Sequence, residues 1–380
     1  MKQVIYADNA ATTKLDQNAF ESMIPWLTDE YGNASQPYSF VRPAKKALAE
    51  AREFIASCIN ASPEEIYFTS GGTESDNWAI KGSAFIDSDR KRIVTSAIEH
   101  HAVLNACKAI EKVGAQVDYI KPDRDGMVTT ERLSEVIADN TKLVSVMYSN
   151  NEIGTIEPIS DLTSLAHQYG AWFHTDAVQA IGHIEIDVKK LGVDMLSASA
   201  HKFNGPKGVG FLYVKNGIQL LSHNDGGAQE RGMRAGTENV AGIVGMAVAL
   251  KENCNHIEEN SKYISALEDR LMNGIKTLDF IRNGSPNHIP GNVSLSFKYA
   301  DGEAILHRMD LMRICISTGS ACDSVNTQIS HVIKAIGVPE DYSRGTIRIS
   351  LGKHNTMDEV DIIVDSLIRI VRDMQTKEFF

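Results

Sequence analysis

The chain has 380 residues, of which 43% are hydrophobic and 23% charged, and its formal net charge is −11 at pH 7. This length can bury a large core and predicts two domains. The acidic balance argues against a protein that binds nucleic acid through its phosphates, so no direct nucleic-acid binding is expected. The first residues carry too short an apolar run for a secretory signal, and no apolar stretch is long enough to cross a bilayer. These features predict a soluble, cytoplasmic protein with no membrane partner.

Short apolar strands alternate with helical patterns over the first 214 residues. A helix pattern over 43–58 has a proline near its start. The predicted strands lie at 66–69, 92–96, 116–120, 143–147, 172–176, 194–197 and 209–214. Alternation of this kind predicts an α/β fold whose sheet is largely parallel and carries helices on its faces.

The pattern changes from about residue 255. Its predicted elements are a helix at 258–278, a strand with alternating faces at 292–297, a short helix at 330–336, a strand at 346–350 and a terminal helix from Asp358. This order predicts a smaller α+β domain beside the first. We expect residues 16–254 to form the large domain, and residues 1–15 with 255–380 to form the small one.

Polar side chains follow several of the predicted strands, and open α/β sheets bind ligands at the carboxyl ends of their strands. An ordinary alternative exists for each, because a strand-end Asp often caps a helix, a lone His is more often a surface or core residue, and an Asn pair can be plain turn chemistry. Since the sheet brings strand ends to one crevice, the set together favours a ligand site. Its members are Gly71-Gly72-Thr73, His100, Asn150-Asn151-Glu152, Asp176, Gln179, Ser199, His201 and Lys202.

Lys202 lies at the mouth of a strand and is followed by a turn. It can be a surface lysine, or a lysine that forms an imine in a partly desolvated site. Pyridoxal phosphate requires such a lysine, an acid facing its pyridine nitrogen and a cradle for its phosphate. Asp176 and the segment Gly71–Thr73 offer the other two features. His100 could stack on the ring and shuttle protons.

Cys322 differs from the other four cysteines. An odd number of cysteines without a CxxC pair predicts neither a disulfide framework nor a zinc site, and no metal is expected. Cys58, Cys107 and Cys315 are expected to be buried structural thiols, and Cys254 part of a polar helix end. Cys322 lies among small and polar residues of a predicted exposed loop, where it is either incidental or a reactive thiol.

Arg348 interrupts an otherwise β-branched strand. It can be the solvent-side residue of that strand. It can also clamp a substrate carboxylate with its two-pronged guanidinium.

Eight segments, in chain order, resemble the cysteine desulfurases. They are Tyr6–Thr13, Thr69–Asn77, Glu99–His100, Asn150–Gly154, His174–Gln179, Ser199–Lys202, Glu230–Thr237 and Ser317–Cys322. The loop around Cys322 is similar to that of the NifS/IscS-like branch rather than the SufS-like one. The resemblance implies a class V, fold-type I pyridoxal-phosphate enzyme, with a mostly parallel seven-stranded sheet between helices in the large domain and a smaller α+β domain.

The resemblance also implies a role for each matched residue. Lys202 forms the covalent link to pyridoxal 5'-phosphate, Asp176 pairs with the ring nitrogen, and His100 stacks on the ring and moves protons. Further contacts to the cofactor come from Gln179 at the ring hydroxyl, from Gly72, Thr73, Ser199 and His201 at the phosphate, and from Asn151.

The implied reaction takes sulfur from L-cysteine and forms L-alanine. Arg348 and Asn151 hold the substrate carboxylate, and the Cys322 thiolate attacks the substrate sulfur to give a persulfide. Thr237 reaches the cofactor phosphate of a neighbouring subunit, which implies a homodimer. The expected acceptor is a protein thiol, such as a scaffold of iron–sulfur cluster assembly or a carrier in another thiolation pathway.

Two rival functions and one departure from the family pattern accompany this interpretation. A selenocysteine lyase or an aminotransferase of the same fold is the first rival, although transamination needs no loop thiol. A binding module without activity is the second, although such a module has no need for Lys202 and Cys322 together.

Residues 32–41 replace the proline, serine, histidine and glycine that the family usually has there. We expect this segment near the active-site entrance, where it would alter substrate access or acceptor docking.

Overall fold

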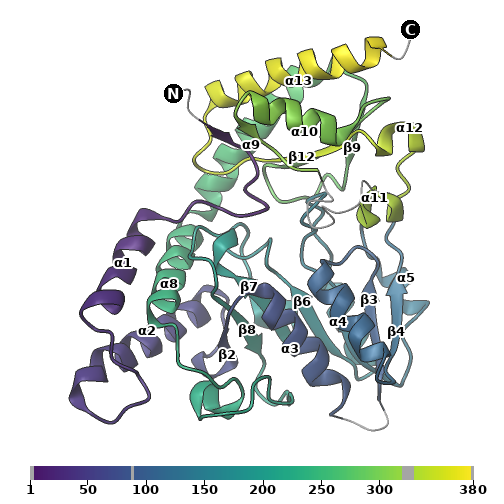
Figure 1. Ribbon diagram of the computed structural model, residues 1–380. Coiled ribbons are helices and arrows are strands. Elements are labelled where there is room, and N and C mark those ends of the chain that lie inside the picture. The colour runs from purple at the N-terminus through teal and green to yellow at the C-terminus, as the bar shows by residue number, and fades with distance from the viewer. Residues whose placement is uncertain (1–3, 87–89, 319–328, 378–380) are drawn as a thin grey trace.

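The computed structural model of the protein describes residues 4–86, 90–318 and 329–377. Figure 1 shows two parts, with a seven-stranded sheet and its helices below and a smaller α+β unit above. The two ends of the described chain, β1 (Ile5–Tyr6) and α13 (Met357–Lys377), both lie in the upper part. Within the described residues, no helix is long and apolar enough to cross a membrane.

The large sheet has the strand order β2-β8-β7-β6-β5-β3-β4. Its strands are β2 (Ile66–Thr69), β3 (Arg92–Ser96), β4 (Gln116–Ile120), β5 (Thr141–Ser145), β6 (Trp172–Asp176), β7 (Met195–Ser199) and β8 (Gly210–Val214). Strand β8 is antiparallel to both neighbours, and the other pairings are parallel. The predicted mostly parallel sheet is therefore confirmed. Because only β8 is reversed, the carboxyl ends of β2, β3, β5, β6 and β7 meet at one edge.

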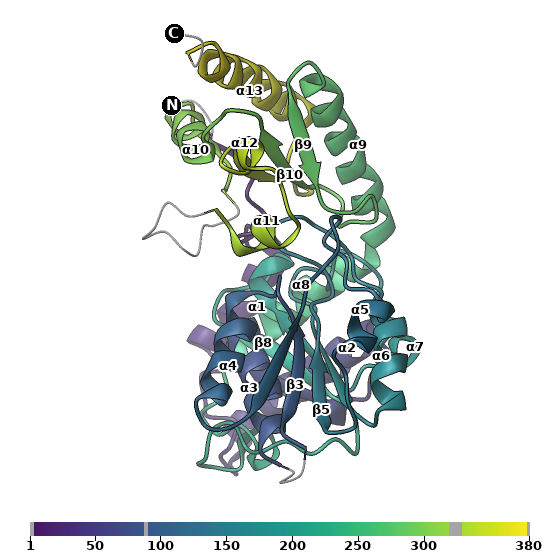
Figure 2. The ribbon, with the colours of Figure 1, turned by 90° about the vertical axis from the view of Figure 1, so that its right-hand side faces the viewer.

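Helices cover both faces of this sheet (Figure 2). They are α1 (Gln17–Thr28), α2 (Arg42–Cys58), α3 (Gly72–Ala84), α4 (His101–Glu111), α5 (Thr130–Ser134), α6 (Ile159–Gln168), α7 (Val188–Leu191) and α8 (Val240–Asn255). Because strand side chains alternate, Val144 and Phe173 join the core formed with α1, α2, α6 and α8, whereas Leu143 and Met195 join the core formed with α3 and α4.

The sequence of α2 explains both its start and its packing. Pro43 lies in the first turn, where a missing N–H group costs nothing. Its buried side chains include Ala44, Ala47, Ala51 and Ile55, which are spaced three or four residues apart and so share one face. The predicted helix over 43–58 is confirmed.

The smaller unit contains an antiparallel sheet of order β12-β10-β9 and a parallel pair β1-β11. Its strands are β9 (Phe280–Asn283), β10 (Asn292–Phe297), β11 (Ile314–Cys315) and β12 (Thr346–Ser350), and its helices are α9 (Ile257–Ile275), α10 (Gly302–Leu311), α11 (His331–Ala335), α12 (Glu340–Ser343) and α13. The strands of the smaller unit lie within the predicted ranges 1–15 and 255–380. The strands of the large sheet lie within the predicted range 16–254. The domain boundaries themselves stay a prediction.

Strand β10 differs from the predicted strand with alternating faces, because all six of its residues are buried. It is the central strand of its sheet. Its serine side chains have hydrogen-bond partners on neighbouring strands, whereas Oδ1 of Asn292 has none among the described residues. Asn283 Nδ2 donates to Oγ of Ser294 (3.1 Å) and of Ser296 (2.8 Å). Cross-strand hydrogen bonds thus allow a polar face to be buried.

Two of the cysteine predictions need correction. Cys107 is buried as expected, but Cys58 and Cys315 are only partly buried. Cys58 is the last residue of α2, and Cys315 lies in a two-residue strand, so neither is fully enclosed by its own element. Cys254, in the last turn of α8, is also partly buried.

Candidate active site

A cavity of about 400 Å³ lies at the carboxyl edge of the large sheet. The predicted site residues that line it are Gly72, Thr73, His100, Asn151, Asp176, Gln179, Ser199, His201, Lys202 and Arg348. Two predicted site residues are not among them. Thr237 is exposed outside the cavity, and Cys322 lies outside the described residues. The fold thus brings most of the predicted set together, whereas the role of each residue stays a prediction.

Lys202 ends a 3-10 turn that directly follows β7. Its Nζ atom donates to the carbonyl oxygens of Ala10 (2.6 Å) and Ala11 (2.8 Å). Gln179 Nε2 also donates to the Ala10 carbonyl (2.9 Å). Lys202 is therefore held inside the cavity against the N-terminal segment, which rules out the surface-lysine alternative.

Asp176 is the last residue of β6 and is 5% exposed. One carboxylate oxygen accepts a hydrogen bond from the backbone N–H of Val178 (2.9 Å). Burial raises the pKa of Asp176 to about 6, whereas the Val178 N–H and the charge of Lys202 act in the opposite direction. A cation inside the cavity would therefore stabilise the ionised form.

His100 is the N-cap of α4, and its Nδ1 accepts the backbone N–H of Ala102 (3.1 Å). The ring proton of the neutral imidazole therefore resides on Nε2. Burial, and then the nearby Lys202 and His101, lower the pKa of His100 to about 4. The imidazole is neutral at neutral pH, and it holds one transferable proton.

The start of α3 forms a small backbone cradle. Gly72 begins the helix and Thr73 follows it, so N–H groups of the first turn lie beside the cavity. A Cβ atom at position 72 would lie 2.6 Å from Cγ2 of Val178, so a larger residue does not fit there. A helix N-terminus of this kind binds phosphate well.

These groups fit pyridoxal phosphate. The cradle at Gly72 and Thr73 suits its phosphate, the buried Asp176 suits its pyridine nitrogen, and the enclosed amine of Lys202 suits its carbonyl carbon. The neutral His201, whose Nδ1 lies 3.1 Å from Oγ1 of Thr12, completes the wall. Its pKa is lowered to about 4 by burial and then by Lys202 and Lys207.

Arg348, on β12, joins the smaller unit to the cavity. The residue is 4% exposed, which excludes the solvent-side alternative. Nη1 donates to the Asn151 carbonyl (2.9 Å), Nη2 donates to Oδ1 of Asp8 (2.7 Å), and the buried Nε has no partner among the described residues. A guanidinium fixed in this way can present its remaining N–H groups to a carboxylate.

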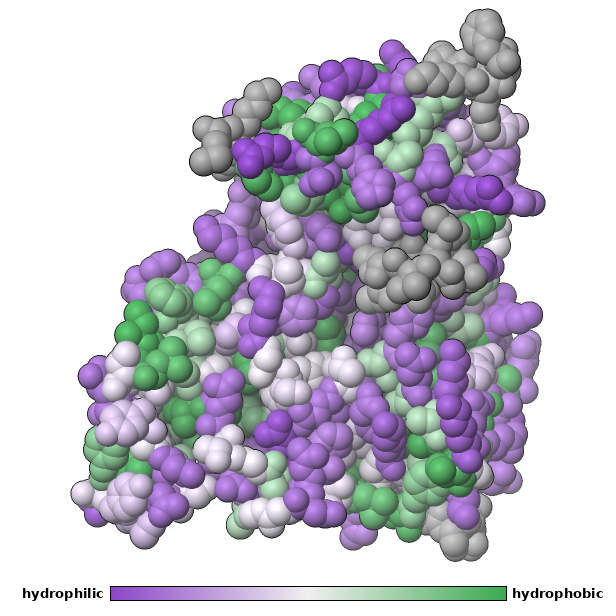
Figure 3. Space-filling view, viewed as in Figure 1, coloured by the Kyte–Doolittle hydropathy of each residue, from purple (hydrophilic) through white to green (hydrophobic). Residues whose placement is uncertain are grey.

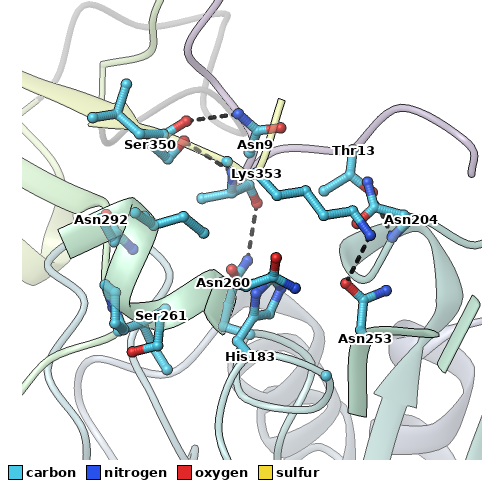
Figure 4. A pocket seen from close by; sticks show the side chains of 18 of the residues that line it. Asn9, Thr13, His183, Asn204, Asn253, Asn260, Ser261, Asn292, Ser350 and Lys353 are labelled. Carbon is cyan, nitrogen blue, oxygen red and sulfur yellow. Dashed lines mark hydrogen bonds between the residues drawn. The ribbon is translucent and has the colours of Figure 1, made fainter. Parts of the chain in front are cut away.

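A second cavity of about 60 Å³ shares Ala10 and Gln179 with the first. Figure 4 shows this second cavity, with Lys353 pointing toward Asn253. Lys353 of the smaller unit donates to Oδ1 of Asn253 (3.3 Å). Nδ2 of the same Asn253 donates to the carbonyl of Phe203 (2.7 Å), next to Lys202. This contact ties the smaller unit to the segment that follows Lys202.

Comparisons with known proteins show the family of this chain. The model of the aminotransferase class-V family matches residues 5–363. The cysteine desulfurase IscS of Methanosarcina thermophila is 46% identical over 376 residues, which cover 98% of this chain and 93% of that protein. A solved NifS-like protein superposes with a TM-score of 0.91 at 37% identity, over 98% of this chain and 100% of the other. The solved structure of SspA in complex with cysteine gives a TM-score of 0.83 at 37% identity, over 93% and 100%.

The chain belongs to the class V cysteine desulfurases. The predicted fold-type I architecture and the dependence on pyridoxal phosphate are thereby confirmed. The described residues contain no group of three or more His, Cys, Asp or Glu side chains that could hold a metal ion.

Several lining residues of this cysteine desulfurase had no predicted role. They are Ala10, Ala11, Asp76, Met147 and Val178. Ala10 and Ala11 act through backbone carbonyls, which no side-chain pattern reveals. Asp76 did carry a signal, since it is an acid one turn into a helix that faces the sheet. Residues 32–41, expected near the entrance, are not among the residues that line this cavity.

Proposed function

We propose that this cysteine desulfurase takes sulfur from L-cysteine, releases L-alanine and holds the sulfur as a persulfide on Cys322. The observation that carries this proposal is the convergence of Lys202, Asp176, His100 and Arg348 in one cavity. An amine, a buried acid, a neutral imidazole and a guanidinium together match the needs of an amino-acid substrate and a pyridoxal cofactor.

Each of these residues has its own role in the proposed reaction. Pyridoxal phosphate, when bound, withdraws electrons from the substrate and so weakens its carbon–sulfur bond. Lys202 provides the amine that carries the cofactor, and Asp176 holds a proton on its ring nitrogen. Arg348 and Asn151 bind the substrate carboxylate. His100 moves a proton through Nε2.

Cys322 receives the sulfur. Its thiolate attacks the substrate sulfur, the carbon–sulfur bond breaks, and its electron pair stays with the carbon, which takes a proton to become alanine. The step needs no external oxidant, because the two electrons that the sulfurs give up in forming the S–S bond reduce the substrate β-carbon to the methyl group of alanine. Ser317 exchanges two backbone hydrogen bonds with Arg348 (3.0 and 2.7 Å), so the chain enters the segment containing Cys322 beside the proposed carboxylate clamp.

Purified protein incubated with L-cysteine tests this proposal. We expect the wild type to absorb as a lysine-bound pyridoxal cofactor and to form sulfide and alanine together. Cys322→Ala should keep the absorbance and lose the sulfide, whereas Cys254→Ser, which removes a thiol from α8, should keep both. Full activity of Cys322→Ala would contradict the proposal and leave a different lyase whose nucleophile lies elsewhere. A keto acid in place of alanine would favour an aminotransferase. Faster turnover of L-selenocysteine would favour the lyase.

A homodimer is part of this proposal, because Thr237 lies outside the cavity of its own chain. An exposed hydrophobic patch lies on α1 and on the segment after it. Figure 3 shows hydrophobic side chains over α1. The patch consists of Phe20, Ile24, Leu27, Tyr31, Tyr38 and Phe40. Gln229 Nε2 donates to Oγ of Ser35 (3.2 Å), which links this segment to the one that carries Thr237. A second copy of the chain would cover such a patch.

Light scattering of paired variants tests the dimer. Leu27 is 64% exposed on the patch, and Leu311 is 84% exposed at the end of α10. Leu27→Glu should yield monomers with weakened cofactor binding, whereas Leu311→Glu should stay dimeric. A monomeric wild type, or a dimeric Leu27→Glu variant, would contradict this part of the proposal.

The sulfur acceptor is proposed to be a protein thiol in the cytoplasm, such as a scaffold of iron–sulfur cluster assembly. The net charge of −11 favours a protein over a nucleic acid as the direct recipient. A purified thiol protein that takes labelled sulfur from the persulfide would support this choice.

A further inference from the structure

Asp76 lies on α3 and lines the cavity, yet the proposed reaction assigns it no role. Its side chain is 1% exposed, and Oδ1 has no hydrogen-bond partner among the described residues. That atom lies 3.7 Å from Nε2 of His174. A buried carboxyl group with an unpartnered oxygen calls for a physical explanation.

His174, on β6, cannot supply a counter-charge to Asp76. Its Nδ1 lies 2.9 Å from Oγ of Ser145, and its Nε2 lies 2.9 Å from Oγ of Ser197. Burial lowers the pKa of His174 to about 3. The imidazole is therefore neutral, with one ring nitrogen donating and the other accepting.

Two further acids face Asp76 from neighbouring elements. Asp176 ends β6, and Glu99 follows β3, while the Ser197 hydroxyl on β7 acts on the same Asp76 carboxyl. Burial, and then the charge of Asp176, raise the pKa of Asp76 well above its usual range, and Ser197 acts in the opposite direction. Burial likewise raises the pKa of Glu99 to about 8. Of these acids, Asp176 is the one that the charge of Lys202 favours as an anion.

We propose that Asp76 is a positioning residue that stays protonated and, with Ser197 and His174, holds Asp176 as the one ionised carboxylate of this cluster. The inference rests on the proposed function, in which Asp176 faces the ring nitrogen of the cofactor. A neutral acid at position 76 adds no second negative charge beside Asp176, where two like charges in a buried site would repel. The proton affinity of the ring nitrogen is then set by Asp176, in a pocket that Asp76 keeps filled.

Two substitutions separate charge from shape. Asp76→Asn keeps the size and hydrogen-bonding groups but cannot ionise, whereas Asp76→Ala removes both. NMR of holoenzyme loaded with cofactor that is isotopically labelled at the ring nitrogen reports the protonation of that nitrogen as pH changes. We expect Asp76→Asn to titrate like the wild type, and Asp76→Ala to titrate roughly one pH unit lower, because water enters the vacated space and solvates the Asp176 anion.

Infrared spectroscopy gives a second readout that needs neither activity nor the alanine variant. The carbonyl band of a protonated carboxyl group should be present in the wild type at neutral pH and reduced in Asp76→Asn. Ser83→Ala is the matched control, because Ser83 is a buried residue of the same helix whose hydroxyl donates to the Ala79 carbonyl (2.6 Å). This variant should leave both the band and the titration unchanged.

The outcomes that overturn the inference are distinct from those that overturn the function. A titration shift in Asp76→Asn as large as that in Asp76→Ala would show that Asp76 acts as an anion. So would a carbonyl band of the wild type that is not reduced in Asp76→Asn. An unchanged titration in both variants would leave Asp76 a packing role. A wild type that binds no cofactor or forms no sulfide would instead contradict the proposed function.

Discussion

His100 and His201 line the same cavity as Lys202, and the pKa of each imidazole falls to about 4. Burial is the main cause, and the charge of Lys202 is the next. Both rings are therefore neutral at neutral pH, and the hydrogen bond from Ala102 to Nδ1 of His100 leaves the transferable proton on Nε2. A single backbone contact thus decides which atom of His100 can act as a proton donor.

Replacement of His100 by glutamine tests this role. The amide keeps a hydrogen-bonding side chain in place but cannot move a proton, so alanine formation should fall by about 100-fold to 10,000-fold while the cofactor stays bound. Turnover assays with L-cysteine, together with the absorbance of the bound cofactor, measure the two effects separately. His167→Gln, on α6, is the control. Activity of His100→Gln within a few-fold of the wild type would contradict the assignment.

At the scale of an element, the turn at Gln229–Gly232 shows how a strained backbone is held. Glu230 (φ 45°) and Arg231 (φ 59°) are both in the left-handed region, which non-glycine residues seldom adopt. Glu230 is buried and accepts both Nη1 (2.8 Å) and Nη2 (2.6 Å) of Arg52, as well as the backbone N–H of Phe68 (2.9 Å). This ion pair ties the turn to α2 and β2, and so positions the segment that leads to Thr237.

Glu230→Gln should therefore destabilise the protein by about 3 kcal/mol, because it leaves the guanidinium of Arg52 without its counter-charge. The midpoint of urea unfolding, measured with the cofactor present, reports the change. The exposed Lys46–Glu50 pair on α2 is the matched control, and Glu50→Gln should leave the midpoint near that of the wild type. Equal effects of the two substitutions would show that the Glu230 pair does not brace the turn.

At the scale of the whole molecule, a buried acid couples stability to pH. Glu99 is fully buried, and its Oε1 accepts from Oγ of Ser96 (2.5 Å) and from the N–H of Met147 (3.0 Å). Burial raises the pKa of Glu99 to about 8, whereas Ser96 and Met147 act in the opposite direction. The folded protein therefore holds a proton that the unfolded chain, with its ordinary Glu pKa, releases at lower pH.

The sign of this coupling is definite. The stabilisation from protonated Glu99 is fully present below a pH near 4.5 and is lost as the pH rises to about 8. Glu99→Gln cannot titrate, so its free energy of unfolding should rise relative to the wild type across this window, by at most about 1.4 kcal/mol per pH unit. Urea unfolding at several pH values in the window measures the difference. A difference that stays constant with pH would mean that Glu99 is ionised in the folded protein.

The sequence determined the polar strand ends and the type of sheet, but their geometry came from tertiary contacts. The sequence predicts Asp176, His100 and Lys202 as site residues because each lies at or just after the end of an apolar strand. This pattern is local and can be seen in single segments of the sequence. No comparable sequence pattern predicts that the carbonyls of Ala10 and Ala11 accept from Lys202, or that Oδ1 of Asp76 has no partner among the described residues. Backbone acceptors and hydrogen-bond deficits exist only between segments that folding brings together.

What the sequence determined by itself is the alternation of strands and helices, the family and the chemical types of the site residues. These follow from local periodicity and from motifs in single segments. Only the tertiary structure decided that Arg348 is buried against Asn151 and Asp8, although its strand alone is equally compatible with an exposed arginine. Only the tertiary structure decided the pKa directions of His100 and Asp176 as well, because desolvation depends on what surrounds a side chain in space rather than on what precedes it in the chain.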